Sequence, residues 1–470
     1  MMWTTRPAAY EDLGLADHDP MYSKGEQEQN FSAAARRIGG RLTGSSSTPL
    51  APRKSWEHGL DLYVARQPIL DRSRRTYAYE LLFRDGLVNA FGAEDPDLAT
   101  ARVIDTSFFV LGIEALTGGR KAFVNFTRQA LVGGYASALP SNLLVVEILE
   151  DVPADAEVLK ACRTLKAGGC TIALDDIVTT APPRGFLDLA DIVKVDFAKT
   201  SAFRRHQIAR ALRRPGTKML AEKVETQEDF TQALKSGYEY FQGYFFARPS
   251  IVAGRAIPAS KLNILNLISE VHRPDLVHAH VENIIKHEVS LTLKLLTHLR
   301  TAAWGFRRPI ESVQHAILLL GDQGVRKWAS VVAIAALGSD QPSELVIASV
   351  VRASFCERLL RDMGLGELAQ DGFFVGLFST IDALLGRPLP EAVDRLPVSE
   401  EVRTALLGGD NALRRVYNVV LAWERGAWGE VSLAAAGLGL RSHEIAACYK
   451  SAVEFGNSIA SVEAARPARP

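Results

Sequence analysis

The residues with the clearest chemical potential are two adjacent carboxylates, Asp175 and Asp176, which follow the apolar segment 171–174. This segment predicts a short buried strand, and an α/β barrel collects the charged groups of its active site at the carboxyl ends of such strands. The same pair also suits the first turn of a helix, where carboxylates bind N–H groups and complement the helix dipole. The pair alone therefore does not establish a site.

Similar apolar segments, each with a polar or charged residue, recur before and after this strand. Helix-like stretches of about 10–15 residues separate them, which predicts parallel strand–helix–strand units. A parallel barrel brings the carboxyl ends of its strands to one face, so these polar side chains are expected to converge there. The alternative is that they only form salt bridges at the rim. The seven residues are Glu80, Asn125, Glu147, Asp175, Lys194, Glu222 and Gln242.

The elements that must position these residues predict an α/β TIM-like barrel over residues 60–252. Its first two strands are expected to pair around the turn 70–75, and glycine pairs are expected to end helices over 97–116 and 154–167. Residues 253–458 carry amphipathic runs without strand patterns, which predicts an all-α helical bundle. The polar, apolar-poor segment 1–59 and residues 459–470 are expected to be disordered tails.

Composition limits the classes of function. Lys+Arg and Asp+Glu both number 54, so no net charge indicates binding to nucleic acid or to an anionic membrane. The four cysteines lack metal-ligand spacing and dense pairing, which fits a reducing compartment. We see neither a long apolar span nor a secretory signal. We therefore expect a soluble cytoplasmic protein that acts through local sites.

Taken together, the motifs of the first region resemble the EAL family of cyclic di-GMP phosphodiesterases. The resemblance covers about 190 residues, and the motifs occur in the family's order. They are Tyr79–Arg84, Val124-Asn125, Glu147, Leu174–Asp176, Val193–Asp196, Ala221–Thr226 and Gln242–Pro249.

This resemblance implies a metal-dependent site for a phosphodiester. Such chemistry needs divalent cations that neutralise phosphate oxygens and generate hydroxide, and carboxylate and amide oxygens suit Mg2+ or Mn2+. The implied metal ligands are Glu80, Asn125, Glu147, Asp175 and Asp176. The implied catalytic residues are Lys194, which holds or activates the attacking water, and Glu222, which completes the arrangement of metal and water. Three further residues are implied in support: Arg84 on a ligand phosphate, Glu225 as a brace for the loop after the Asp-Asp strand, and Gln242 beside the site.

The sequence also departs from the family pattern. The name-giving Glu-Ala-Leu reads Glu80-Leu81-Leu82, which changes packing and not ligand chemistry. The family follows its Asp-Asp pair with a glycine-rich loop over the metal that also joins two barrels, whereas residues 177–184 carry two prolines. Lys223 stands where the family has glycine. These changes predict weak binding or slow turnover, and they leave a homodimer open.

The helical region resembles the HDOD domain in its segments 287–296, 310–321 and 326–330. A barrel followed by this domain is similar to the EAL-HDOD signalling proteins of bacteria. HDOD domains are related to metal-dependent phosphohydrolases that use a His-Asp pair, but no such pair occurs after residue 60. A metal role for the histidines at 272, 278, 280 and 287 is the less favoured alternative. We expect a helical interaction module with an unidentified protein partner.

Three hypotheses for function remain. In the first, a degenerate EAL barrel senses cyclic di-GMP or a partner, with weak or no hydrolysis, and passes its state to the HDOD module. In the second, the barrel is an active phosphodiesterase that converts cyclic di-GMP to pGpG with Mg2+ or Mn2+. In the third, the chain is a scaffold that binds no nucleotide, so ligand and metal produce no thermal shift.

Overall fold

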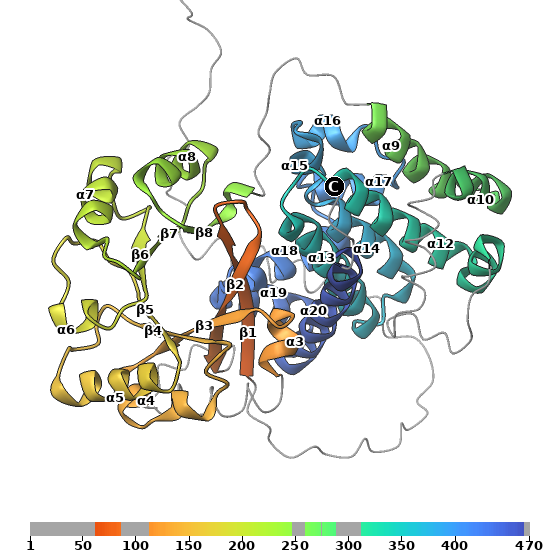
Figure 1. The fold of residues 1–470 in the computed structure, drawn as a ribbon. Coiled ribbons are helices and arrows are strands. Elements are labelled where there is room, and N and C mark those ends of the chain that lie inside the picture. Colours follow the sequence, from red (N-terminus) through yellow and green to blue (C-terminus); the bar gives the residue numbers. More distant parts are fainter. Residues whose placement is uncertain (1–61, 86–111, 247–258, 274, 288–311, 465–470) are drawn as a thin grey trace, which may run out of the picture. The chain divides into compact units, whose positions relative to one another are not determined.

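The computed structural model describes residues 62–85, 112–246, 259–273, 275–287 and 312–464. The expected N-terminal tail, residues 1–59, lies outside the described residues, as do most of the expected helix 97–116 and the last six residues of the chain. Two regions follow one another within the described ranges, a barrel and then a set of helices (Figure 1). No helix in these ranges combines the length and the apolar character needed to span a membrane.

Eight strands close into a barrel in chain order, which confirms the expected fold class. Strands β2 to β8 pair in parallel, whereas β1 runs antiparallel to both of its neighbours, β2 and β8. The strands are β1 (Leu62–Asp71), β2 (Thr76–Asp85), β3 (Lys121–Phe126), β4 (Leu144–Ile148), β5 (Thr171–Leu174), β6 (Ile192–Asp196), β7 (Lys218–Glu222) and β8 (Tyr240–Gln242).

Local interactions fix the two kinds of connection in the barrel. In the β1–β2 turn, one carboxylate oxygen of Asp71 accepts hydrogen bonds from the N–H groups of Ser73 and Arg75. Helix α5 begins after Asp155, which accepts from the N–H groups of Glu157 and Val158. The barrel helices are α3 (Ile113–Thr117), α4 (Arg128–Val132), α5 (Ala156–Ala167), α6 (Arg184–Leu187), α7 (Ala202–Leu212) and α8 (Gln227–Ser236), with 3-10 turns at Tyr135–Ala138 and Tyr244–Phe246.

An apolar layer of eight side chains, one from each strand, fills the interior of the barrel. All eight are buried, and they pack against one another as a single cluster. Because side chains alternate between the two faces of a strand, a residue two positions further along each strand again points into the barrel. The layer therefore fixes which residues line the next level. It consists of Ile69, Ala78, Phe123, Val145, Ala173, Ile192, Leu220 and Tyr240.

The second region is helical, as expected, and is organised around the buried helix α13 (Ser343–Asp362). Helices α14, α18 and α20 contact α13 directly. The last of them runs past residue 458, where we expected the region to end. The other helices are α9 (Ala259–Val271), α10 (His278–His287), α12 (Val313–Leu337), α14 (Ala369–Phe378), α15 (Ile381–Leu385), α16 (Leu389–Val393), α17 (Glu400–Leu406), α18 (Ala412–Glu424), α19 (Trp428–Leu438) and α20 (Ser442–Ala464), with a 3-10 turn at Gly366–Leu368.

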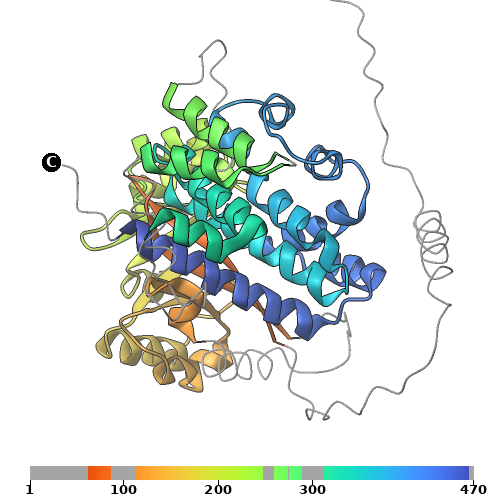
Figure 2. The same ribbon diagram turned by 90° about the vertical axis from the view of Figure 1, so that its right-hand side faces the viewer.

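Buried hydrogen bonds join the helices to β1 and β2 of the barrel. The indole N–H of Trp423 in α18 donates to the Val64 carbonyl, 3.1 Å away. The backbone N–H of Arg66 donates to the Tyr449 hydroxyl of α20, at 3.2 Å. The Tyr79 hydroxyl donates to the buried Glu344 carboxylate of α13, at 2.8 Å. In Figure 2, α20 (dark blue) runs past the β1–β2 pair, and it contacts both β1 and α3.

His272, at the end of α9, has a pKa that its surroundings shift. Its Nε2 lies 2.9 Å from the Ser330 hydroxyl, and its ring packs on Phe374 with 4.3 Å between centroids. Burial and, to a smaller extent, the charge of nearby Arg326 together lower the pKa of His272 to about 4. The folded protein therefore keeps this imidazole neutral at pH values where the unfolded chain protonates it.

This shift predicts that the protein loses stability as the pH falls below the ordinary histidine range. A histidine with a lowered pKa contributes stability above its unfolded pKa and loses it as the pH drops toward the folded value. Between pH 7.5 and 5 we expect a loss of roughly 1–2 kcal/mol from His272. His272→Gln should reduce this acid shift in melting experiments, whereas His206→Gln on the exposed side of α7 should not. Equal acid shifts in both variants would contradict the assignment.

Candidate active site

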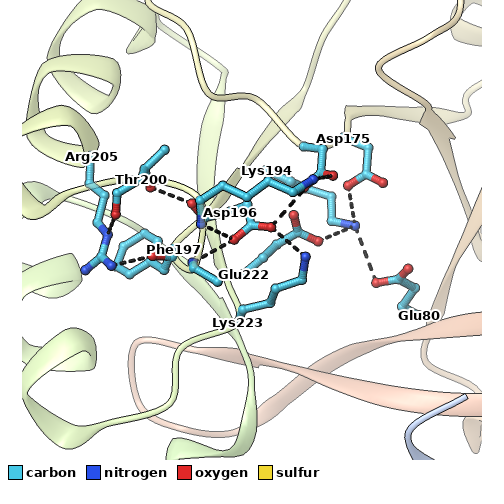
Figure 3. A network of polar contacts seen from close by, with 12 residues as sticks. Glu80, Asp175, Lys194, Asp196, Phe197, Thr200, Arg205, Glu222 and Lys223 are labelled. Carbon is cyan, nitrogen blue, oxygen red and sulfur yellow. Dashed lines mark hydrogen bonds and ion pairs between the residues drawn. The ribbon is translucent and has the colours of Figure 1, made fainter. Parts of the chain in front are cut away.

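The residues expected to carry chemistry form the level directly above the apolar layer. Glu80, Glu147 and Lys194, for example, each stand two residues after a member of that layer on their strand. The same offset applies to Asn125, Asp175, Glu222 and Gln242. The parallel strands therefore carry all seven expected residues to the carboxyl end of the barrel. Figure 3 shows Lys194 with Glu80, Asp175 and Glu222 around it.

Lys194 is the centre of this level, and its side chain is completely buried. Its Nζ lies 2.8 Å from Glu222 Oε1, 2.9 Å from Asp175 Oδ1 and 3.4 Å from Glu80 Oε2. It also contacts Glu147 Oε1. Four carboxylates face one ammonium group, an excess of three negative charges when all are ionised. This group of five residues is called the acidic set below.

The enclosure of the acidic set changes the pKa values of its members. Burial raises the pKa of Glu222 to about 7, despite the opposing effect of Lys194. Burial also raises the pKa of Glu147 well above its usual range, and the neighbouring Glu80 adds to the effect. Burial alone would lower the pKa of Lys194, but the surrounding carboxylates reverse this and raise it. Lys194 therefore remains charged.

Several oxygen atoms at this level are buried without a hydrogen-bond partner. Glu147 Oε2 is one of them, whereas Glu147 Oε1 and Asp175 Oδ1 lie within ion-pair distance of Lys194 Nζ. Asn125 Oδ1 and Gln242 Oε1 are also without a partner. Buried acceptors of this kind are costly when unpaired, and carboxylate and amide oxygens are the ligands that Mg2+ and Mn2+ prefer. The donor set thus fits a divalent cation.

Lys194 Nζ stands at the point where these oxygens meet. Within the described ranges, no three His, Cys, Asp or Glu side chains form a ready-made metal site. The expected ligands Glu80, Glu147 and Asp175 are close together around Lys194, whereas Asn125 is placed beside Glu147 by the β3–β4 register. A cation can therefore enter only if the ammonium group gives way.

Gln242 links the acidic set to a residue that the sequence analysis missed. Its Nε2 donates to Glu80 Oε2 at 2.7 Å and to Gln67 Oε1 at 3.1 Å. Gln67 lies on β1, two residues before Ile69. Because β1 runs antiparallel to its neighbours, the residue of β1 at the level of the acidic set lies two positions before Ile69, not two positions after it. The hairpin turn at 70–75 was the sequence signal that indicated this reversal.

A second group of charges surrounds Asp176, which makes none of the contacts of the acidic set. Asp176 Oδ2 lies 2.5 Å from Lys199 Nζ. The buried Asp196 has its Oδ2 2.5 Å from Lys223 Nζ, and its Oδ1 accepts from the N–H groups of Ala198 and Lys199. Burial would raise the pKa of Asp196, but Lys223 and these N–H groups hold it below its usual range. These four residues, Asp176, Asp196, Lys199 and Lys223, are called the balanced set.

Two members of the balanced set have left-handed backbone conformations. Asp176 has a φ of 49° and Lys223 a φ of 53°. Such angles are strained for residues with a side chain and favour glycine, which explains why glycine suits the Lys223 position in the family. Strained backbone of this kind is typical of functional sites.

The remaining expected residues, Arg84 and Glu225, and the proline-containing loop are not members of either set. Arg84 is in β2, but its side chain lies outside the described residues. Glu225 is exposed after the end of β7. The proline-containing segment 177–183 is attached by a hydrogen bond from the Ile177 N–H to the Lys194 carbonyl, at 3.0 Å. The roles expected for these residues stay predictions.

Fold and site thus define an α/β-barrel protein with an acidic site at the carboxyl ends of its strands, followed by a helical region. The EAL domain matches residues 113–249, and the HDOD domain matches residues 257–398. The chain belongs to the family of proteins in which an EAL domain is followed by an HDOD domain.

Two relatives match nearly the whole arrangement. The uncharacterized protein YuxH of Bacillus subtilis is 34% identical over 406 residues, which cover 85% of this chain and 98% of the relative. The cyclic di-GMP phosphodiesterase CdgJ of Vibrio cholerae is 34% identical over 372 residues, which cover 78% and 85%. Among solved structures, a standalone EAL protein from Vibrio cholerae in its c-di-GMP-bound form is 23% identical, with a TM-score of 0.31, covering 41% of this chain and 93% of that one.

Proposed function

We propose that this chain is a signalling protein whose barrel binds cyclic di-GMP together with Mg2+ or Mn2+ and hydrolyses it slowly to pGpG. The observation that carries the proposal is the acidic set, in which four carboxylates face one ammonium group and Glu147 Oε2 is buried without a hydrogen-bond partner. A cation would neutralise these charges and in turn attract a phosphodiester. The name of the relative CdgJ, a cyclic di-GMP phosphodiesterase, supports the choice of substrate.

The residues at the carboxyl end of the barrel have different proposed roles in binding the metal ion and moving a proton. Glu80, Asn125, Glu147 and Asp175 are the proposed metal ligands; when bound, the ion supplies charge neutralisation and a more acidic water. Gln242 orients Glu80 through its hydrogen bond. Glu222 is the proposed proton acceptor, and Lys194 holds the water or the phosphate charge beside it.

Two other residues are given roles around the ligand. Arg84 is proposed to contact a phosphate, since a guanidinium group pairs with two oxygens at once. Glu225 is proposed to brace the loop that follows Asp175 and Asp176. Asp176, the fifth expected metal ligand, is not assigned to the ion in this proposal, because its carboxylate pairs with Lys199.

Slow turnover is proposed because the surroundings of Asp176 are altered. The carboxylate of Asp176 forms an ion pair with Lys199, and Pro182 and Pro183 lie in the loop that follows Asp176. The second candidate is a phosphodiesterase of full activity, which the retained ligands around Lys194 and the name of CdgJ favour. Both candidates give the helical region the same role, that of an interaction module for a protein partner. The buried hydrogen bonds of Glu344 and Tyr449 to the barrel connect this module directly to the barrel.

Hydrolysis and binding measured side by side test the proposal. The full chain is incubated with cyclic di-GMP and Mg2+ or Mn2+ to follow pGpG, while calorimetry with Ca2+ measures binding without turnover. We expect clear binding, slow pGpG formation, and loss of both in Asp175→Ala. Rapid turnover that depends on Asp175 would favour the second candidate. A chain that neither binds nor hydrolyses the nucleotide would leave only the scaffold hypothesis.

Restoring a flexible loop is predicted to raise turnover. Replacing residues 178–183 by a segment of the Gly-Thr-Gly type removes Pro182 and Pro183 and restores the backbone freedom that closure over a ligand requires. We expect pGpG formation to rise at least several-fold with little change in melting temperature. Pro215→Gly, in the loop between α7 and β7, is the matched control and should leave turnover unchanged. A folded loop variant with the original rate would count against a role for the prolines.

A further inference from the structure

The acidic set and the balanced set are neighbours in the barrel and differ in charge. Asp175 belongs to the first and the adjacent Asp176 to the second. On β6, Lys194 belongs to the first, while Asp196, two residues later, belongs to the second (Figure 3). Two groups of carboxylates side by side are the arrangement that holds two divalent ions in many phosphodiester-cleaving enzymes.

Carboxylates outnumber ammonium groups in the acidic set but not in the balanced set. In the acidic set, four carboxylates face one ammonium group. In the balanced set, two carboxylates face two ammonium groups, since Lys199 pairs with Asp176 and Lys223 with Asp196. A divalent cation needs uncompensated oxygen ligands, so the acidic set can attract one and the balanced set cannot.

The oxygens of the two sets differ in the same way. In the acidic set, Glu147 has one oxygen, Oε1, on Lys194, while its buried Oε2 has no hydrogen-bond partner. Asp196, by contrast, uses both oxygens: Oδ1 accepts from two backbone N–H groups, and Oδ2 contacts Lys223. Lys223 has a backbone φ of 53°, which is strained for a lysine. Its ion pair with Asp196 can offset that strain.

We propose that Lys199 and Lys223 take the place of a second divalent ion, so that the barrel holds one metal ion per chain, in the acidic set. This inference rests on the proposed metal-dependent function and specifies its metal content. Lys223 is the more important of the two lysines because its partner Asp196 is completely buried, whereas Asp176 keeps some exposure. A site with one ion lacks the clamp on both reacting oxygens that two ions provide, which accounts for slow turnover.

Metal stoichiometry tests this inference without reference to activity. Equilibrium dialysis and electron paramagnetic resonance with Mn2+ alone are carried out on the full chain and on the double variant Lys199→Ala/Lys223→Gly. The glycine also relieves the strained backbone, so this variant should fold. We expect one Mn2+ per wild-type chain, and two in the double variant with the spectral broadening of two coupled ions. Lys166→Ala, whose lysine pairs with Asp191 away from both sets, should keep one.

The outcomes separate this inference from the function on which it rests. Two ions in the wild type would overturn the inference and leave the metal-dependent function standing. One ion in the double variant would also overturn it, because the lysines would not be what excludes the second ion. No bound Mn2+ in any variant would overturn the proposed function, and the inference with it.

Discussion

Replacing Lys194 by methionine is expected to lower the melting temperature strongly in metal-free buffer and much less in excess Mn2+. The substitution keeps most of the side-chain volume but leaves four carboxylates without a cation. Removing one partner from a buried ionic cluster costs about 3–5 kcal/mol, because the remaining charges stay buried. A divalent ion can supply the missing charge once the ammonium group no longer occupies the centre of the site. Melting curves with EDTA and with Mn2+ measure both effects.

Lys218→Met is the matched control for this experiment. Lys218 begins β7 at the opposite end of the barrel, and its side chain is half exposed. Its loss should shift the melting temperature little, and equally with and without Mn2+. If Lys194→Met were destabilised to the same extent in both buffers, the acidic set would not accept a metal in place of the ammonium group. The metal-dependent function would then lose its main support.

Replacing Glu147 by glutamine is expected to reduce turnover of cyclic di-GMP at least ~100-fold while raising stability in metal-free buffer. Burial raises the pKa of Glu147, so the ionised carboxylate disfavours the folded state above its ordinary pKa. A neutral side chain of the same shape removes that penalty. It also removes a charge that a metal ion needs. Rates of pGpG formation, together with melting temperatures in EDTA, measure the two opposite effects.

The control for Glu147→Gln is Glu239→Gln, a partly exposed position just before β8. This variant should change neither rate nor melting temperature appreciably. Glu147→Gln with both activity and stability reduced would mean that the carboxylate supports the fold through Lys194. Unchanged activity would exclude Glu147 as a metal ligand.

Much of the site followed from the sequence because a barrel imposes a simple rule. Glu80, Lys194 and Gln242 each end or interrupt an apolar run, and strand periodicity places them two residues above the apolar layer. The barrel and the convergence of the charged residues were expected from the alternation of apolar runs with helix-like stretches. The helical region was likewise recognisable from its amphipathic runs.

Other features depend on geometry that the sequence does not express. Gln67 reaches the site because β1 runs in the opposite direction; the turn at 70–75 indicated that reversal, but no motif singled out Gln67 itself. Asp176 is separated from Asp175 because adjacent residues point to different sides of a strand or its continuation, and the backbone turns left-handed there. That Lys194 contacts four carboxylates could be found only from side-chain positions.

The hydrogen bonds between the helices and the first two strands limit how this protein can be rearranged by recombination. A barrel separated from its helices would expose Arg66 and Tyr79, both buried here, and would lose Trp423 from the Val64 carbonyl. The helices in turn would expose the carboxylate of Glu344. The two regions should therefore be inherited together, and a chimaera with a relative should fold well only when it preserves the matching partners on both sides.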